Sequence, residues 1–136
     1  MSAKEKLQSL LKASDEQMAT LLKNNPPELI IARIIALCES VKSQKADAVF
    51  GITPNYAMIS VPPGGRGTKV VELLPQREKV VVNVMKLPVN AAFQKGREQL
   101  FRDGKLNWYR LDFKEESDFD TMLGAILDVY EQKRQK

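Results

Sequence analysis

The 136-residue sequence predicts an α+β fold: N-terminal helices, an antiparallel β-meander, then a helix, a strand and a helix packed on one face of the sheet. Apolar residues recur at helical spacing before residue 45, β-branched residues gather in short runs between residues 48 and 85, and helical spacing returns near the C-terminus. No flexible linker separates these regions. We therefore expect residues 1–136 to form one domain, with 1–45 as a helical arm or lobe and 46–136 as the α+β core.

Two short amphipathic helices are predicted at the start of the chain. Their apolar stripes consist of Leu7, Leu10 and Leu11, and of Met18, Leu21 and Leu22. Ser14 and Gln17 form a capping box, in which the hydroxyl accepts from a backbone amide and the Gln side chain accepts from the cap amide. The second helix is therefore expected to begin at Asp15.

A third, longer helix is predicted after Asn25. This residue can cap the helix, Pro26 suits the first helical position because it has no amide to leave unpaired, and Glu28 faces the positive end of the helix dipole. The helix should continue to about Gln44. Its apolar side consists of Ile30, Ile34, Leu37, Cys38 and Val41, with Arg33 elsewhere.

Four short runs rich in Val, Ile and Tyr follow, each bounded by Pro, Gly or Asn, and they are predicted to be strands. They are Ala48–Ile52, Tyr56–Val61, Lys69–Leu74 and Lys79–Met85. A glycine-rich loop, 62–67, joins the second to the third, and 75–78 joins the third to the fourth. Connections this short favour an antiparallel meander.

The remainder of the chain predicts a helix from Asn90 to about Arg102, a strand at Leu106–Phe113, and a final helix after Ser117. Ser117 and Asp120 resemble a variant capping box. The stripe of the final helix consists of Phe119, Met122, Leu123, Ile126 and Tyr130. Strand and helix should pack on the preceding meander.

Several segments after Tyr56 occur in a familiar order. They are Tyr56–Ile59, the run VELLPQREKV at 71–80, Trp108–Leu111, Asp118–Asp120 and the pair Tyr130 and Glu131. Over about residues 46–132 the chain resembles a family of small prokaryotic domains labelled "predicted transport protein". The resemblance implies an α+β fold, and it implies no catalytic residue.

The composition excludes several kinds of chemistry. With no histidine and one cysteine, the chain has no Ser-His-Asp or Cys-His pair, no histidine-ligated metal and no internal disulfide. The acids between Asp112 and Asp120 are explained by the start of the last helix, where carboxylates are favoured. We therefore expect a non-enzymatic protein with no cofactor and no metal. No run of about 18 apolar residues and no signal peptide is present, so we expect no membrane partner and a cytoplasmic location.

The net charge of +4 is concentrated in the middle of the chain. Residues 64–110 contain ten Lys or Arg and four acids, a net of +6. Such a region suits phosphate contacts, which release counterions, so one hypothesis is a nucleic-acid-binding protein of low sequence specificity. The candidate residues are Arg66, Lys69, Arg77, Lys79, Lys95, Arg97, Arg102, Lys105 and Arg110. The glycine-rich loop could contact phosphate through its backbone amides, or it could be a plain hairpin loop that requires no ligand. Its spacing does not match the known phosphate-binding motifs.

The first hypothesis is a non-enzymatic binding module that acts through protein–protein contacts, with a homodimer as one form. Short amphipathic helices are unstable alone and must pack on something. The candidate interface residues are Leu7, Leu11, Met18, Leu21 and Leu22. The alternative is that these side chains pack on the chain's own sheet.

Overall fold

A computed structural model describes residues 2–65, 67–85 and 108–135 and confirms the predicted α+β class. The helices are α1 (Ala3–Leu11), α2 (Asp15–Leu21), α3 (Glu28–Gln44) and α5 (Phe119–Arg134), with a short 3₁₀ turn η1 (Glu116–Asp118). The strands are β1 (Val49–Thr53), β2 (Tyr56–Ser60), β3 (Lys69–Pro75), β4 (Val80–Met85) and β5 (Trp108–Phe113). The predicted helix at Asn90–Arg102 lies outside the described residues.

The five strands form one sheet in the order β1-β2-β3-β4-β5, with every neighbouring pair antiparallel, so the meander is confirmed. Successive residues of a strand point to opposite faces, which defines two faces. The helix face carries Phe50, Ile52, Ala57, Ile59, Val71, Leu73, Val80, Val82, Val84, Leu111 and Phe113. The outer face carries Val49, Gly51, Thr53, Met58, Glu72, Leu74, Val81, Asn83, Arg110 and Asp112.

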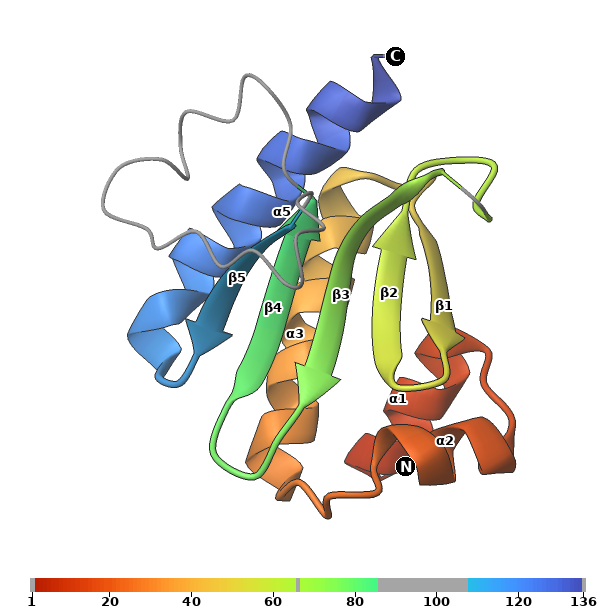
Figure 1. Ribbon diagram of the computed structural model, residues 1–136, viewed down its shortest axis with the longest axis vertical. Helices are drawn as coiled ribbons and strands as arrows, with labels where there is room; N and C mark the ends of the chain where they lie inside the picture. The colour runs from red at the N-terminus through yellow and green to blue at the C-terminus, as the bar shows by residue number, and fades with distance from the viewer. Residues whose placement is uncertain (1, 66, 86–107, 136) are drawn as a thin grey trace.

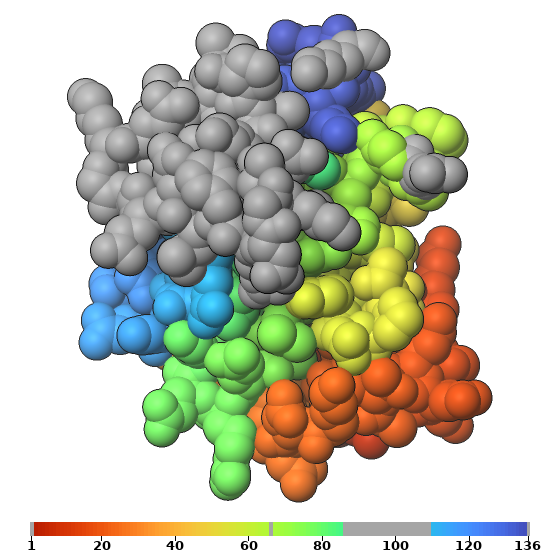
Figure 2. All heavy atoms as spheres, viewed as in Figure 1, coloured from red at the N-terminus to blue at the C-terminus, as the bar shows by residue number. Residues whose placement is uncertain are grey.

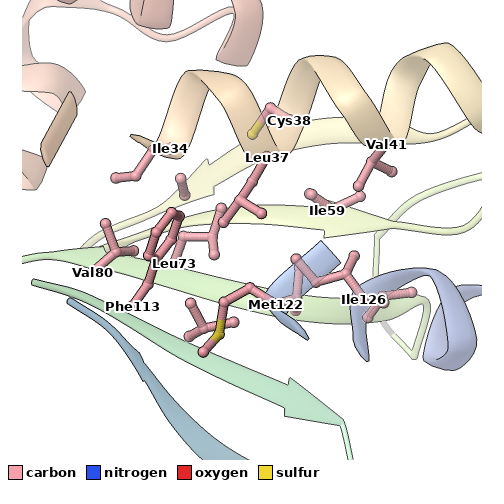
Figure 3. Packing of buried hydrophobic residues seen from close by; sticks show 14 of the residues in the cluster. Ile34, Leu37, Cys38, Val41, Ile59, Leu73, Val80, Phe113, Met122 and Ile126 are labelled. Carbon is pink, nitrogen blue, oxygen red and sulfur yellow. The ribbon is translucent and has the colours of Figure 1, made fainter. Parts of the chain in front are cut away.

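Helices α3 and α5 cover the helix face of the sheet (Figure 1). In Figure 3, side chains of α3 such as Leu37 point toward the strands, where they meet Leu73 and neighbouring residues, and Met122 and Ile126 of α5 lie alongside. Residues from α1, α2 and α3 belong to the same buried cluster as those from the strands. Residues 1–45 are therefore part of the core of the described structure.

The helix starts confirm the predicted capping box of the second helix and correct the predicted starts of the two longer helices. At α2 both bonds of the capping box between Ser14 and Gln17 are present. Helix α3 begins at Glu28, with Pro27 as its N-cap and no side-chain cap, so the predictions that Asn25 caps it and that Pro26 takes its first position were wrong. Asn25 has a left-handed φ of 51°, which asparagine tolerates, and its amide bonds to a carbonyl at the end of α2. Before α5, the capping box is formed by Glu115 and Asp118, not by Ser117 and Asp120.

Arg33 of α3 is buried, contrary to its predicted place away from the apolar side. Its Nη1 donates to the Lys114 carbonyl at 2.8 Å, and its Nε lies 3.1 Å from a carboxylate oxygen of Glu116. The guanidinium also lies 5.2 Å from the centroid of the Phe113 ring. These contacts join α3 to the connection between β5 and α5.

A second polar cluster joins the segment before β1 to α5. The hydroxyl of Tyr130 donates to Asp47 at 2.7 Å, and the other carboxylate oxygen of Asp47 lies 2.7 Å from Nη1 of Arg134. Burial, and then the hydrogen bond to Asp47, raise the pKa of Tyr130, so the phenol stays protonated and can donate. Lys45 and Glu131 form a further ion pair at 2.7 Å. Strand β1 therefore starts from a fixed position.

Candidate functional site

Four of the five predicted interface residues are buried inside the chain. Leu7, Leu11, Met18 and Leu21 are at most 2% exposed and belong to the common core, while Leu22 is half-buried against it. The alternative, that the N-terminal stripes pack within their own chain, is the arrangement that the structure has. In this conformation Leu7, Leu11, Met18 and Leu21 present almost no surface to a partner, and Leu22 is only partly accessible.

The predicted phosphate-binding cations divide into three groups. Arg66, Lys95, Arg97, Arg102 and Lys105 lie outside the described residues. Lys69, Lys79 and Arg110 each form an ion pair with a carboxylate. Arg77 is exposed on the β3–β4 turn, and no ion pair joins it to the described parts of the chain. The four cations that can be placed therefore meet two carboxylates, since Lys79 and Arg110 share Asp112, and part of their charge is neutralised by the chain's own acids.

Two ion-pair clusters lie at the outer face of the sheet. Lys69 Nζ is 2.9 Å from Glu72, while Asp112 accepts from Lys79 at 3.1 Å and from Arg110 at 3.2 Å. Partial burial raises the pKa of Asp112, but the hydrogen bonds and charges of Lys79 and Arg110 outweigh it, so the pKa lies below its ordinary value of 3.8. Asp112 is therefore charged at neutral pH and stabilises the pairing of β4 with β5.

Asn83 occupies the middle of the outer face, on β4. It is 2% exposed, and its side-chain oxygen has no hydrogen-bond partner among the described residues. The register places it opposite Glu72 of β3 and Arg110 of β5. Asn83 is the one polar side chain of β4, whose other residues are Val and Met.

The glycine-rich loop has the backbone of a tight connection between β2 and β3. Gly64, Gly65 and Gly67 all have positive φ, which a glycine adopts without strain. The hydroxyl of Thr68 donates to the Gly65 carbonyl at 2.7 Å, and the Thr68 carbonyl accepts from Val61. These local bonds account for the loop without a bound phosphate.

A hollow of about 670 Å³ lies between the β3–β4 turn and the segment that precedes α3. Its lining includes Asn25, Pro27, Arg77 and Lys79. Figure 2 shows this end of the molecule, with the turn in green beside the orange segment. Arg77 and the start of α3 give the hollow a positive side, whereas Glu78 at its rim opposes an anion.

The described residues hold no cluster of three acids or cysteines that could bind a metal ion. The acids near the C-terminus have structural partners: Asp118 accepts from the amides of Lys114 and Glu115, and Glu116 pairs with Arg33. Burial, and to a smaller extent Glu39, raise the pKa of Cys38 to about 12, so its thiol is protonated. Within the described ranges, none of the helices has the length and hydropathy needed to cross a bilayer.

The two outer strands of the open sheet differ sharply. An edge strand exposes unpaired amides and carbonyls, and proteins commonly protect such an edge with charged side chains. The β5 edge carries Arg110 and Asp112 and continues into Lys114. The β1 edge, Val49–Thr53, has no charged residue and no proline. Only β5 therefore has this protection.

The backbone of β1 pairs on one side alone. Its register with β2 runs from Val49 opposite Ser60 to Thr53 opposite Tyr56. Across the described ranges, no backbone hydrogen bond joins residues 49–53 to any segment other than β2. All five residues are half-buried, and α1 contacts β1. In Figure 1, β1 forms the right-hand margin of the sheet. This open edge is the candidate site, and it was not among the candidate residues predicted from the sequence.

Comparisons with known protein families, with curated proteins and with solved structures found no match to this chain. The resemblance to the "predicted transport protein" family therefore stays a prediction.

Replacing Asp112 with Asn should lower the free energy of unfolding by about 1 kcal/mol at pH 7, because Lys79 and Arg110 lose their shared carboxylate. A carboxyl with a depressed pKa stabilises the fold above its unfolded pKa and ceases to do so as pH falls through its folded pKa. The difference from wild type should therefore shrink below about pH 4.

Urea denaturation at several pH values measures this difference. Glu78→Gln is the matched control, since Glu78 is exposed and forms no ion pair with the described residues. It should leave stability unchanged. A destabilisation by Asp112→Asn that stays constant from pH 7 to pH 3 would show that the ion pairs are not its cause.

Proposed function

We propose that the protein is a non-enzymatic module that binds another polypeptide by adding one of its strands to the open edge of β1. The observation that carries this proposal is the uncharged, singly paired edge of Val49–Thr53. Its unpaired backbone groups can form hydrogen bonds with an extended segment, as in other proteins that bind by strand addition.

Side chains of β1 support the same proposal. Phe50 and Ile52 lie on the helix face and are only partly buried, so an added strand would extend the apolar face that they form. Val49 and Thr53 lie on the outer face and are β-branched, which suits a pleated surface. The partner segment is therefore expected to alternate apolar residues on one face with small or β-branched residues on the other.

The proposal is tested by selecting displayed random peptides of about nine residues for binding to the wild-type chain. Gly51→Lys is the blocked variant, because lysine is a natural protector of edge strands. A Cβ at Gly51 meets only the terminal methyl of Met58, at 3.2 Å, and that flexible side chain can move. Gly124→Lys is the matched control, since a Cβ there meets nothing within 4 Å.

Selected peptides should alternate apolar and polar residues. They should lose about tenfold or more in affinity for Gly51→Lys, and should bind Gly124→Lys as they bind wild type. If no peptide is enriched, or if enriched peptides bind both variants equally, the β1 edge is not a binding site.

Nucleic-acid binding makes a different prediction in a titration with short duplex and single-stranded DNA and RNA. Strand addition at β1 requires no phosphate contacts, so we expect no complex at about 50 mM salt. Binding that weakens by orders of magnitude between about 50 and 200 mM salt would instead favour the basic region as the functional surface.

A further inference from the structure

We infer that the strand added to β1 is β1 of a second copy of this chain, paired antiparallel about a two-fold axis at Gly51, so that two five-stranded sheets join into one. This inference rests on the proposed function and specifies its partner. Three features of β1 support it: its self-complementary sequence, its central glycine and the absence of charge.

The sequence of β1 is self-complementary in one register. An antiparallel pair centred on Gly51 places Val49 opposite Thr53 of the other copy, and Phe50 opposite its Ile52. Residues directly opposite each other share a face, so Phe50 and Ile52 meet on the helix face, and Val49 and Thr53 on the outer face. A register shifted by two residues keeps the faces but leaves residues unpaired at both ends. Only the register centred on Gly51 pairs all five.

Gly51 has no strong explanation within a single chain. Its φ is not in the left-handed region, and a Cβ at this position would meet only the flexible end of Met58. A glycine inside a strand lowers its stability and often marks a close approach of another backbone. At the two-fold axis this glycine would face its own copy, which leaves the outer face open for Met58 from both chains.

The absence of charge on β1 permits pairing with a second copy. Residues 49–53 contain no ionisable group, so self-pairing brings no like charges together. An edge containing Arg110 and Asp112, as in β5, would place these charges against their own copies in some registers. Five paired residues per chain form a small contact, so the dimer should be weak and concentration-dependent.

The most informative variants change Gly51, the residue that lies on the proposed two-fold axis. A residue on a two-fold axis faces itself, so Gly51→Asp and Gly51→Lys each place two like charges in direct opposition. Sedimentation velocity from about 1 µM to 1 mM should show the wild type passing from 15.3 kDa to twice that mass. Each variant alone should dimerise about tenfold more weakly or worse. An equal mixture of the two should restore dimerisation, because Asp then faces Lys.

Two controls separate this result from misfolding or from a general charge effect. Gly124→Asp and Gly124→Lys carry the same charges on α5 and should dimerise as the wild type does. Gly51→Cys should form a disulfide-linked dimer under mild oxidation, because the two sulfur atoms would face each other, whereas Gly124→Cys should not. Cys38 is fully buried and should not interfere.

The outcomes also separate this inference from the proposed function. A wild type that stays monomeric at 1 mM while strand peptides still bind β1 overturns the self-pairing and leaves the proposed function standing. A dimer unaffected by Gly51→Asp, or variants that the mixture fails to restore, overturns the register. A monomer that binds no strand peptide overturns both.

Discussion

Backbone amides and carbonyls that lie at the edge of an open sheet must find partners, water or protection, and this constraint governs how the molecule can act. Over the described residues the five-stranded meander has two such edges, and no further described strand pairs with either. At β5 the edge carries Arg110 and Asp112, which pair with each other while Lys79 adds a second cation. Strand β1 has no charged side chain and no proline to protect its edge. The functional proposals follow from this asymmetry, not from any pocket.

The rest of the fold holds β1 in place for this role. The Tyr130–Asp47–Arg134 cluster fixes the chain just before the strand, and the glycine-rich loop brings Gly64 against Val49. Helix α1 contacts β1 and packs on α3. A strand anchored at its start and along the side of β2 is ordered before any partner arrives, so binding costs less conformational entropy on this side.

Much of the fold could be predicted from the sequence because its signals are local. The capping box at Ser14 and the apolar period of α3 depend on residues within a few positions, and the short connections between strands dictate antiparallel neighbours. Burial of Arg33 could not be predicted in this way, because its partners Lys114 and Glu116 come from the far end of the chain. The site was missed for a related reason: an edge is defined by which strand has no neighbour, and composition does not show this. The pairing of Asp112 with both Lys79 and Arg110 was likewise not visible in the number of cations, because Asp112 is 33 residues from Lys79.

Hydrogen exchange at the backbone amides of β1, followed at low and high protein concentration, measures whether the open edge of β1 pairs with the same strand of a second copy. In a single chain, alternate amides of β1 bond to β2 and the others remain available to solvent. These available amides should exchange rapidly at about 10 µM and become protected at about 1 mM, and they should stay unprotected in Gly51→Lys. If they exchange at the same rate at both concentrations in the wild type, while the remaining strands behave as folded, the open edge does not pair with its own copy.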